Sequence, residues 1–158
     1  MLSIFILSAV CCFSQSAVNT YATNGEYFFD SLAIKENISA AAVSQFNKMF
    51  TNVEDVKWHS TDNGSTVKFN KDGINHHVFF NKRGKWTATI KNLPLETLPG
   101  WVSARAKSDF RNFSVFFAQY VRTPAGHIYI LKIEKGNAWK TIKVSPEATE
   151  VVEEYVRN

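Results

Sequence analysis

The chain has 158 residues, of which 45% are hydrophobic and 14% aromatic, and its formal net charge is +4. This composition excludes a disordered or collagen-like chain, because it supplies enough apolar surface to offset the entropy lost on ordering. The length excludes a barrel enzyme and a two-domain dinucleotide enzyme, and it suits one ordinary domain or two small units.

The N-terminal segment is uncharged and apolar and then ends abruptly. Its apolar stretch runs from Leu2 to Phe13, which is shorter than the roughly 20 residues that cross a bilayer and typical of the core of a secretory signal peptide. Cleavage after Ser14 and cleavage after Ser16 are both open, and a buried first strand or helix is the structural alternative. We predict a signal peptide over residues 1–16 and a secreted or periplasmic location.

Both cysteines, Cys11 and Cys12, lie within this segment. Its removal would leave a mature chain without cysteine, and therefore without a disulfide or a thiolate ligand for zinc. A lipoprotein anchor at Cys11 or Cys12 is the alternative, although no small residue stands directly before Cys11. No later stretch reaches transmembrane length, so we expect an exported protein without a membrane span.

Helix and strand patterns begin at Ile38, after a polar segment over 17–37 that we interpret as an N-terminal arm or linker. Ser39 can cap a helix in which Val43 and Phe46 recur at helical spacing. Four runs typical of strands follow, each separated from the next by a turn that contains glycine. They are Val53–His59, Ser65–Asn70, Ile74–Asn81 and Lys85–Lys91.

The same order of elements returns after Leu93-Pro94, which predicts a first unit over 38–93 and a second over 94–158. An amphipathic helix is expected over Leu98–Phe110. The strands expected after it are Phe113–Arg122, Ile128–Glu134 and Ala138–Val144.

The C-terminal residues 145–158 fit two structures. Ser145-Pro146-Glu147 is typical of a helix start, whereas the repeat places a strand at Thr149–Val156. We predict the strand.

Short motifs of the first unit carry a resemblance to a known family. They are Phe46-Asn47-Lys48-Met49-Phe50, Val53-Glu54-Asp55-Val56-Lys57-Trp58 and Phe80-Asn81-Lys82-Arg83-Gly84-Lys85-Trp86. From Ile38 onward the chain resembles the exported PepSY-like, beta-lactamase-inhibitor-like (BLIP-like) proteins. The resemblance implies an α+β fold of two tandem units, each a helix packed on a four-stranded antiparallel sheet. It also implies binding or inhibition of a protein, although a fold is carried over more safely than a function.

Alternation of side chains along the strands predicts which of them leave the helix-covered face of each sheet. In the first unit the open face is polar and basic around Phe79. In the second it is apolar, although a sheet face in water should be polar, and Phe116 is expected on the core side. We predict a partner-binding surface made by Phe79, Val115, Phe117, Val121, Ile130 and Trp139.

An apolar patch formed by this many side chains is usually covered, and the sequence leaves open what covers it. The cover could be internal, by the Tyr21–Phe29 part of the arm or by the other unit. It could also be a second copy of the chain or an outside partner.

Patterns of catalysis and ligation are missing from the sequence. His76 and His77 are neighbours on a strand and point to opposite faces, and no carboxylate stands at ligand spacing near His59 or His77. No nucleophile elbow, phosphate loop or metalloprotease motif is found. The basic residues are scattered and form no stripe for nucleic acid. We therefore expect no enzyme activity, no metal, no cofactor and no nucleic-acid partner.

These observations predict an exported, non-enzymatic binding protein that engages an envelope or extracellular protein through the open sheet face. One alternative is a small-ligand or peptide binder that uses the same face or the cleft between the units. Another is a structural homodimer.

Overall fold

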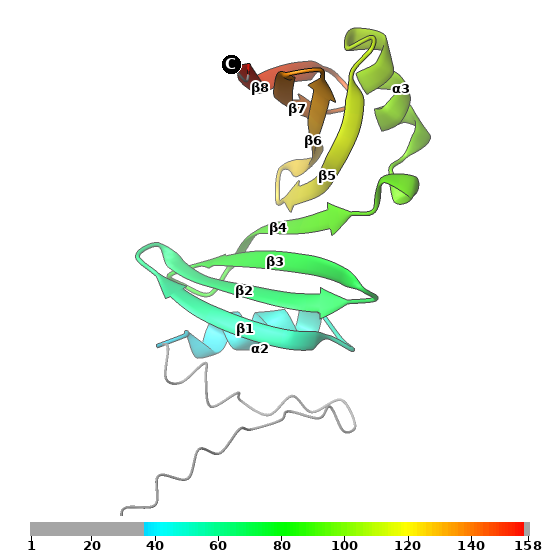
Figure 1. Cartoon of the computed structure of the whole chain (residues 1–158). Helices are drawn as coiled ribbons and strands as arrows, with labels where there is room; N and C mark the ends of the chain where they lie inside the picture. Colours follow the sequence, from blue (N-terminus) through cyan, green and yellow to red (C-terminus); the bar gives the residue numbers. More distant parts are fainter. Residues whose placement is uncertain (1–36, 157–158) are drawn as a thin grey trace, which may run out of the picture.

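The computed structural model describes residues 37–156 (Figure 1). The predicted signal peptide at 1–16 lies outside the described residues, as does the predicted arm apart from Asn37. The alternatives for cleavage and lipid anchoring therefore stay predictions.

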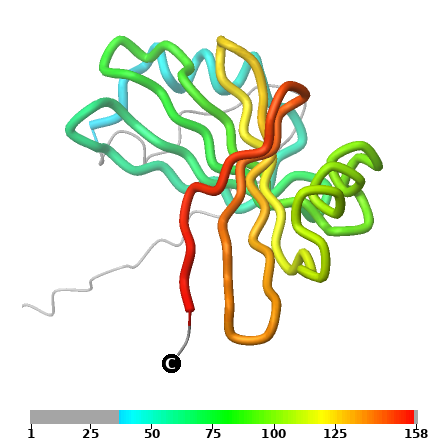
Figure 2. Tube along the Cα trace, turned by 90° about the horizontal axis from the view of Figure 1, so that it is seen from above, coloured from blue at the N-terminus to red at the C-terminus, as the bar shows by residue number. Residues whose placement is uncertain are grey.

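The described chain consists of eight strands, two short α-helices and one turn of 3-10 helix (Figure 1). The helices are α2 (Ala40–Met49), η1 (Leu95–Thr97) and α3 (Gly100–Asp109). The strands are β1 (Glu54–Thr61), β2 (Gly64–Lys71), β3 (Ile74–Asn81), β4 (Trp86–Leu93), β5 (Ser114–Thr123), β6 (Gly126–Lys135), β7 (Ala138–Val144) and β8 (Thr149–Val156). The C-terminal strand is confirmed, and Figure 2 shows it in red beside β7.

All eight strands form a single antiparallel sheet in the order β1 to β8. β4 pairs with β5 from Thr89 opposite Arg122 to Leu93 opposite Ala118. The predicted fold class, two tandem helix-plus-four-strand units of the α+β class, is therefore wrong, because the described part of the chain is mostly sheet and that sheet is continuous. Pairing of β4 with β5 removes two open edges, whose backbone groups would otherwise need water or another strand.

One face of the sheet carries both helices and both parts of the core. α2 packs Val43 and Phe46 against β1–β3, and α3 packs Val102 and Ala106 against β5–β7. The first cluster is Ala42, Val43, Phe46, Trp58, Val67, Phe69, Val78 and Phe80. The second is Val102, Ala106, Ala118, Tyr129, Leu131, Ile133, Ile142 and Val144. The opposite face of the sheet has no helix within the described residues.

His76 belongs to the helix-bearing face of β3 and is 5% exposed. Its Nδ1–H donates to the carbonyl oxygen of Ile74 at 2.8 Å, and its ring stacks on Phe69 with centroids 4.9 Å apart. Burial is the main cause that lowers the pKa of His76 below the usual 6.5. A buried imidazolium is disfavoured, so the folded chain holds this side chain neutral.

We expect the free energy of unfolding to fall as the pH drops below about 6.5, because His76 binds a proton more readily in the unfolded chain. His76→Phe should weaken this decline. His127→Phe, at an exposed position, should preserve it. Urea unfolding at about pH 7.5 and about pH 5 measures the difference. Parallel pH profiles for the native chain and His76→Phe would contradict the assignment.

Candidate functional site

A β-bulge in β5 decides which aromatic side chains leave the core. Val115 lies opposite Ile133 and Phe117 lies opposite Lys132, so Phe116 is an extra residue in the strand. Val115 consequently packs against the α3 cluster, whereas Phe116 is 39% exposed. The predicted positions of Val115 on the open face and Phe116 in the core are both wrong, because the bulge shifts the alternation of side chains.

Aromatic side chains gather on the open face at one end of β5–β8. The rings of Phe116 and Trp139 lie with centroids 5.5 Å apart, and Trp139 stands opposite Tyr155 of β8. The Lys132 ammonium lies 5.7 Å from the ring centre of Phe117. We call Phe116, Phe117, Trp139 and Tyr155 the aromatic surface.

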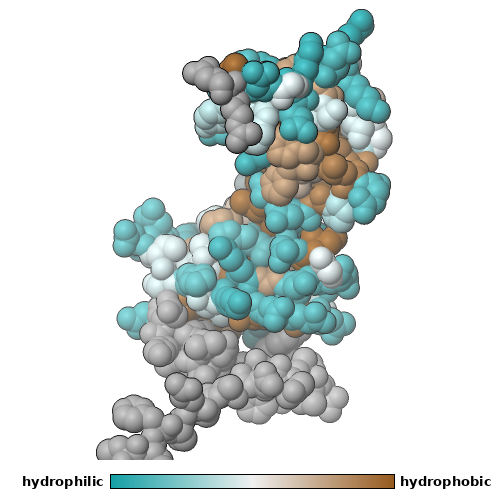
Figure 3. Space-filling view, in the orientation of Figure 1, coloured by the Kyte–Doolittle hydropathy of each residue, from teal (hydrophilic) through white to brown (hydrophobic). Residues whose placement is uncertain are grey.

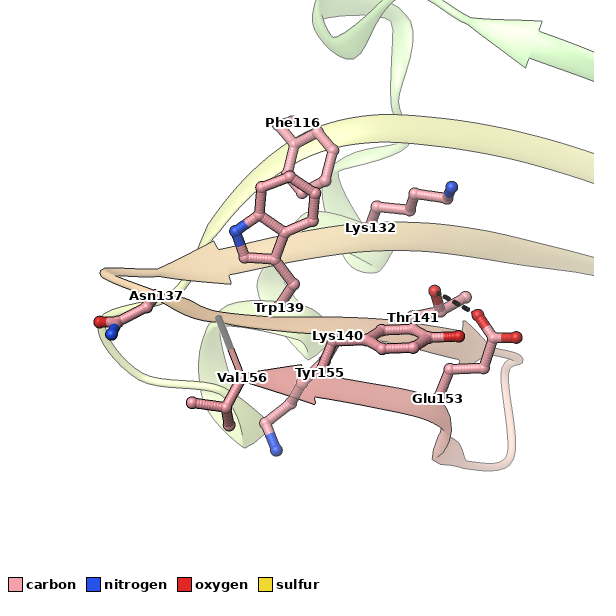
Figure 4. A pocket seen from close by; sticks show the side chains of 9 residues that line it. All are labelled: Phe116, Lys132, Asn137, Trp139, Lys140, Thr141, Glu153, Tyr155 and Val156. Atoms are coloured by element: carbon pink, nitrogen blue, oxygen red, sulfur yellow. Dashed lines mark hydrogen bonds between the residues drawn. The ribbon is translucent and has the colours of Figure 1, made fainter. Parts of the chain in front are cut away.

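A cavity of about 520 Å³ opens beside this surface, within the 300–1,000 Å³ typical of ligand sites. Figure 4 shows Trp139 and Phe116 on one side of it and Tyr155 extending toward Glu153 on the other. The Thr141 hydroxyl donates to Glu153 Oε2 at 3.3 Å. The lining residues are Phe116, Lys132, Asn137, Trp139, Lys140, Thr141, Glu153, Tyr155 and Val156.

Aliphatic side chains continue the open face toward β4. Val121 lies opposite Ile128 on β6 and opposite Ile90 on β4, and Ile130 lies opposite Gln119. The four aliphatic side chains are half-buried. The space-filling view shows the apolar residues gathered over β5 and β6 (Figure 3). Of the predicted site residues, Phe117, Val121, Ile130 and Trp139 thus share one face of neighbouring strands.

Phe79 lies on the same face of the sheet but on β3, two strand spacings from β5 and four from β7, which corresponds to about 10 and about 19 Å. It pairs with Ala88 of β4, toward the Arg122 end of β5 and away from Phe117. Its ring centroid lies 4.2 Å from that of His77, whose Nε2 is buried without a hydrogen-bond partner among the described residues. Burial, followed by the charges of Lys68 and His59, lowers the pKa of His77. Phe79 is therefore not part of the aromatic surface.

Sequence reasoning missed the contribution of β8. Among the described strands it is the last, so its outer edge is open there, and Tyr155 and Val156 are 60% and 66% exposed. Two ion pairs attach β8 to β7: Lys140 with Glu154, and Lys143 with Glu150, the latter at 3.1 Å. The signal available in the sequence was the expected strand over Thr149–Val156, which contains Tyr155 and Val156. The register that sets Tyr155 opposite Trp139 is known only from the structure.

Among residues 37–156, no group of three or more His, Cys, Asp or Glu side chains is arranged to hold a metal ion. In the same range, every helix is too short or too polar to cross a bilayer.

Comparisons with known proteins bear on the fold. No protein-family profile and no curated protein matches the chain. A DUF2874 family protein from Bacteroides ovatus is similar in structure, with a TM-score of 0.63 and 24% identity over 73% of this chain and 88% of that one. A BLIP-like protein from Bacteroides fragilis has a TM-score of 0.62 and 21% identity over 75% and 86%.

A protein provisionally described as periplasmic, from Bacteroides eggerthii, has a TM-score of 0.63 and 17% identity over 75% of this chain and 88% of that one. Likeness at these identities shows the fold alone. The BLIP-like part of the resemblance is confirmed at the level of the fold, and the PepSY-like part stays a prediction.

Proposed function

We propose that this chain is an exported, non-enzymatic binding protein that engages a protein partner through the aromatic surface and the neighbouring Val121 and Ile130. The proposal of export, to the periplasm or outside the cell, draws on the apolar segment over 1–16 and on the description of the Bacteroides eggerthii relative. An inhibitor-like action, in which the surface covers part of an enzyme, accords with the BLIP-like fold.

The observation that carries this proposal is the exposure of large aromatic side chains on the sheet face that bears no helix within residues 37–156. Trp139 is 42% exposed although strands pair on both sides of it, with Glu134 opposite on β6 and Tyr155 opposite on β8. Tryptophan and tyrosine contribute most of the binding energy in many interfaces, because they bury a large rigid area and lose little side-chain entropy. Lys132 and Lys143 would form the polar rim.

The open edge of β8 supports an engaged protein more than a small ligand. The outer backbone groups of β8 can pair with a strand of the partner protein. The side chains of Trp139 and Tyr155 would then contact other parts of that partner. A structural homodimer would use the same edge and face, and the experiment below distinguishes it by the mass of the product.

We expect a photoreactive amino acid at Tyr155 to form a covalent adduct with one discrete protein in cells that make this chain. Trp139→Ala should lower the adduct yield and weaken binding about thirtyfold, as expected for loss of a hot spot of about 2 kcal/mol. Trp101→Ala is the matched control, because Trp101 is a tryptophan on α3 with 40% exposure.

Thermal unfolding of both variants verifies that neither change disturbs the fold. An adduct with the mass of two chains would show that the surface binds a second copy of this chain and would contradict an outside partner. No adduct, or an adduct equally abundant in Trp139→Ala, would contradict the proposed surface.

A further inference from the structure

A groove of about 540 Å³ lies on the helix-bearing face of the sheet, on the other side from the aromatic surface. The α2 cluster covers β1–β3 and the α3 cluster covers β5–β7. Figure 1 shows the two helices at opposite ends of the sheet with β4 between them. The groove therefore follows the line where β4 pairs with β5.

The walls of this groove are aromatic, and its charged groups are all positive. Phe50, Trp86, Tyr120 and Tyr129 supply rings to the lining. Lys91 and Arg122 also line it, and no Asp or Glu of the described chain does. Its volume is that of a site for a small organic molecule.

The two cations are diagonal neighbours on paired strands. Thr89 stands opposite Arg122 and Lys91 opposite Tyr120, a geometry that places Lys91 and Arg122 about 7 Å apart at their backbones. The Arg122 guanidinium lies 5.7 Å from the ring centre of Trp86. The Lys91 ammonium lies 5.9 Å from that of Tyr120. Aromatic rings in the wall thus hold both charges at the groove.

No carboxylate of residues 37–156 neutralises these cations, because the ion pairs there join Lys140 to Glu154 and Lys143 to Glu150. Tyr129 contributes a phenol group to the lining of the groove, and its side chain is 7% exposed. Burial, and secondarily Tyr120, raises the pKa of Tyr129, so its hydroxyl stays protonated and can donate a hydrogen bond.

We propose that this groove binds a small organic anion, a single carboxylate attached to an aromatic or short aliphatic body. The carboxylate would bridge the Arg122 guanidinium and the Lys91 ammonium, since both donate charge-assisted hydrogen bonds. The apolar body would lie among Trp86, Tyr120 and Tyr129. This site is separate from the proposed partner surface, and it requires neither Trp139 nor β8.

Hydrocinnamate is a suitable probe, because it joins one carboxylate to a phenyl ring, and its uncharged amide has the same shape. We expect hydrocinnamate to bind with a Kd of about 1 mM or lower and to shift the backbone NMR resonances of Trp86, Lys91 and Tyr120. The amide should bind at least about tenfold more weakly, because it lacks the charge that the two cations recognise.

Variants of the cations complete the test. Lys91→Gln combined with Arg122→Gln should weaken hydrocinnamate binding at least about tenfold. The matched control is Arg83→Gln with Lys85→Gln, which removes the same two charges from exposed positions outside the groove and should preserve the affinity.

Arg122→Gln alone, at an exposed position, is the variant to use if the double variant does not fold. Equal affinity for the acid and the amide would overturn the proposal. So would undiminished binding to the groove variants, or the absence of shifts at about 10 mM probe. Trp139→Ala should bind hydrocinnamate normally, so the outcome is independent of the partner surface.

Discussion

Gly84→Ala is expected to lower the free energy of unfolding by about 3 kcal/mol, whereas Gly73→Ala should lower it by only about 1 kcal/mol. Both glycines lie in turns of the same sheet with φ +74°, so the conformational strain on an alanine is the same at the two positions. The difference between them comes from space. A Cβ at Gly73 meets nothing within 4 Å.

A Cβ at Gly84 would lie 2.5 Å from the backbone nitrogen of Ala42 and 2.6 Å from the Cβ of Ala41. These atoms belong to the first turn of α2, which the turn between β3 and β4 contacts closely. The backbone N–H of Trp86 donates to Gln45 Oε1 at 2.8 Å. The turn therefore cannot move away without losing a hydrogen bond to the same helix. The overlap therefore has to displace α2 from the core.

Urea unfolding of the two variants and the native chain measures the difference. Similar losses at both glycines would show that the contact with α2 is loose and that only the backbone conformation matters.

The sequence pattern predicts elements well where a local signal fixes them. Ser39 accepts a hydrogen bond from the Ala42 N–H at 3.1 Å, as expected for a helix cap. Ile74–Asn81 and Ala138–Val144 are strands with the bounds expected from turn glycines and alternation. At the C-terminus the repeat is the better guide than the local helix signal, since Thr149–Val156 is a strand.

Features that depend on pairing between distant strands could not be predicted in the same way. No residue pattern in β4 or β5 indicates that the two strands pair, so two separate sheets were expected in place of the single one. The bulge at Phe116 is a matter of register with β6, and one extra residue moves Val115 to the other face. The groove that holds Lys91 and Arg122 depends on the first of these features, because β4–β5 pairing brings the two cations together.

The continuous sheet also bears on the predicted division into units 38–93 and 94–158, which stays a prediction. Leu131→Ala is expected to lower the free energy of unfolding by about 3 kcal/mol, because Leu131 is fully buried in the α3 cluster and its loss leaves a cavity. Because β4 and β5 are paired, we expect the loss to reach the other half of the chain.

Amide hydrogen exchange at Val67 and Val78, both fully buried under α2, measures this coupling. Their protection should fall about a hundredfold in Leu131→Ala, together with that of β6 and β7, if the sheet unfolds as one. Val151→Ala, at a position 46% exposed on β8, is the control and should change little. Undiminished protection at Val67 and Val78 would mean that each half unfolds by itself and that β4–β5 pairing joins two independent units.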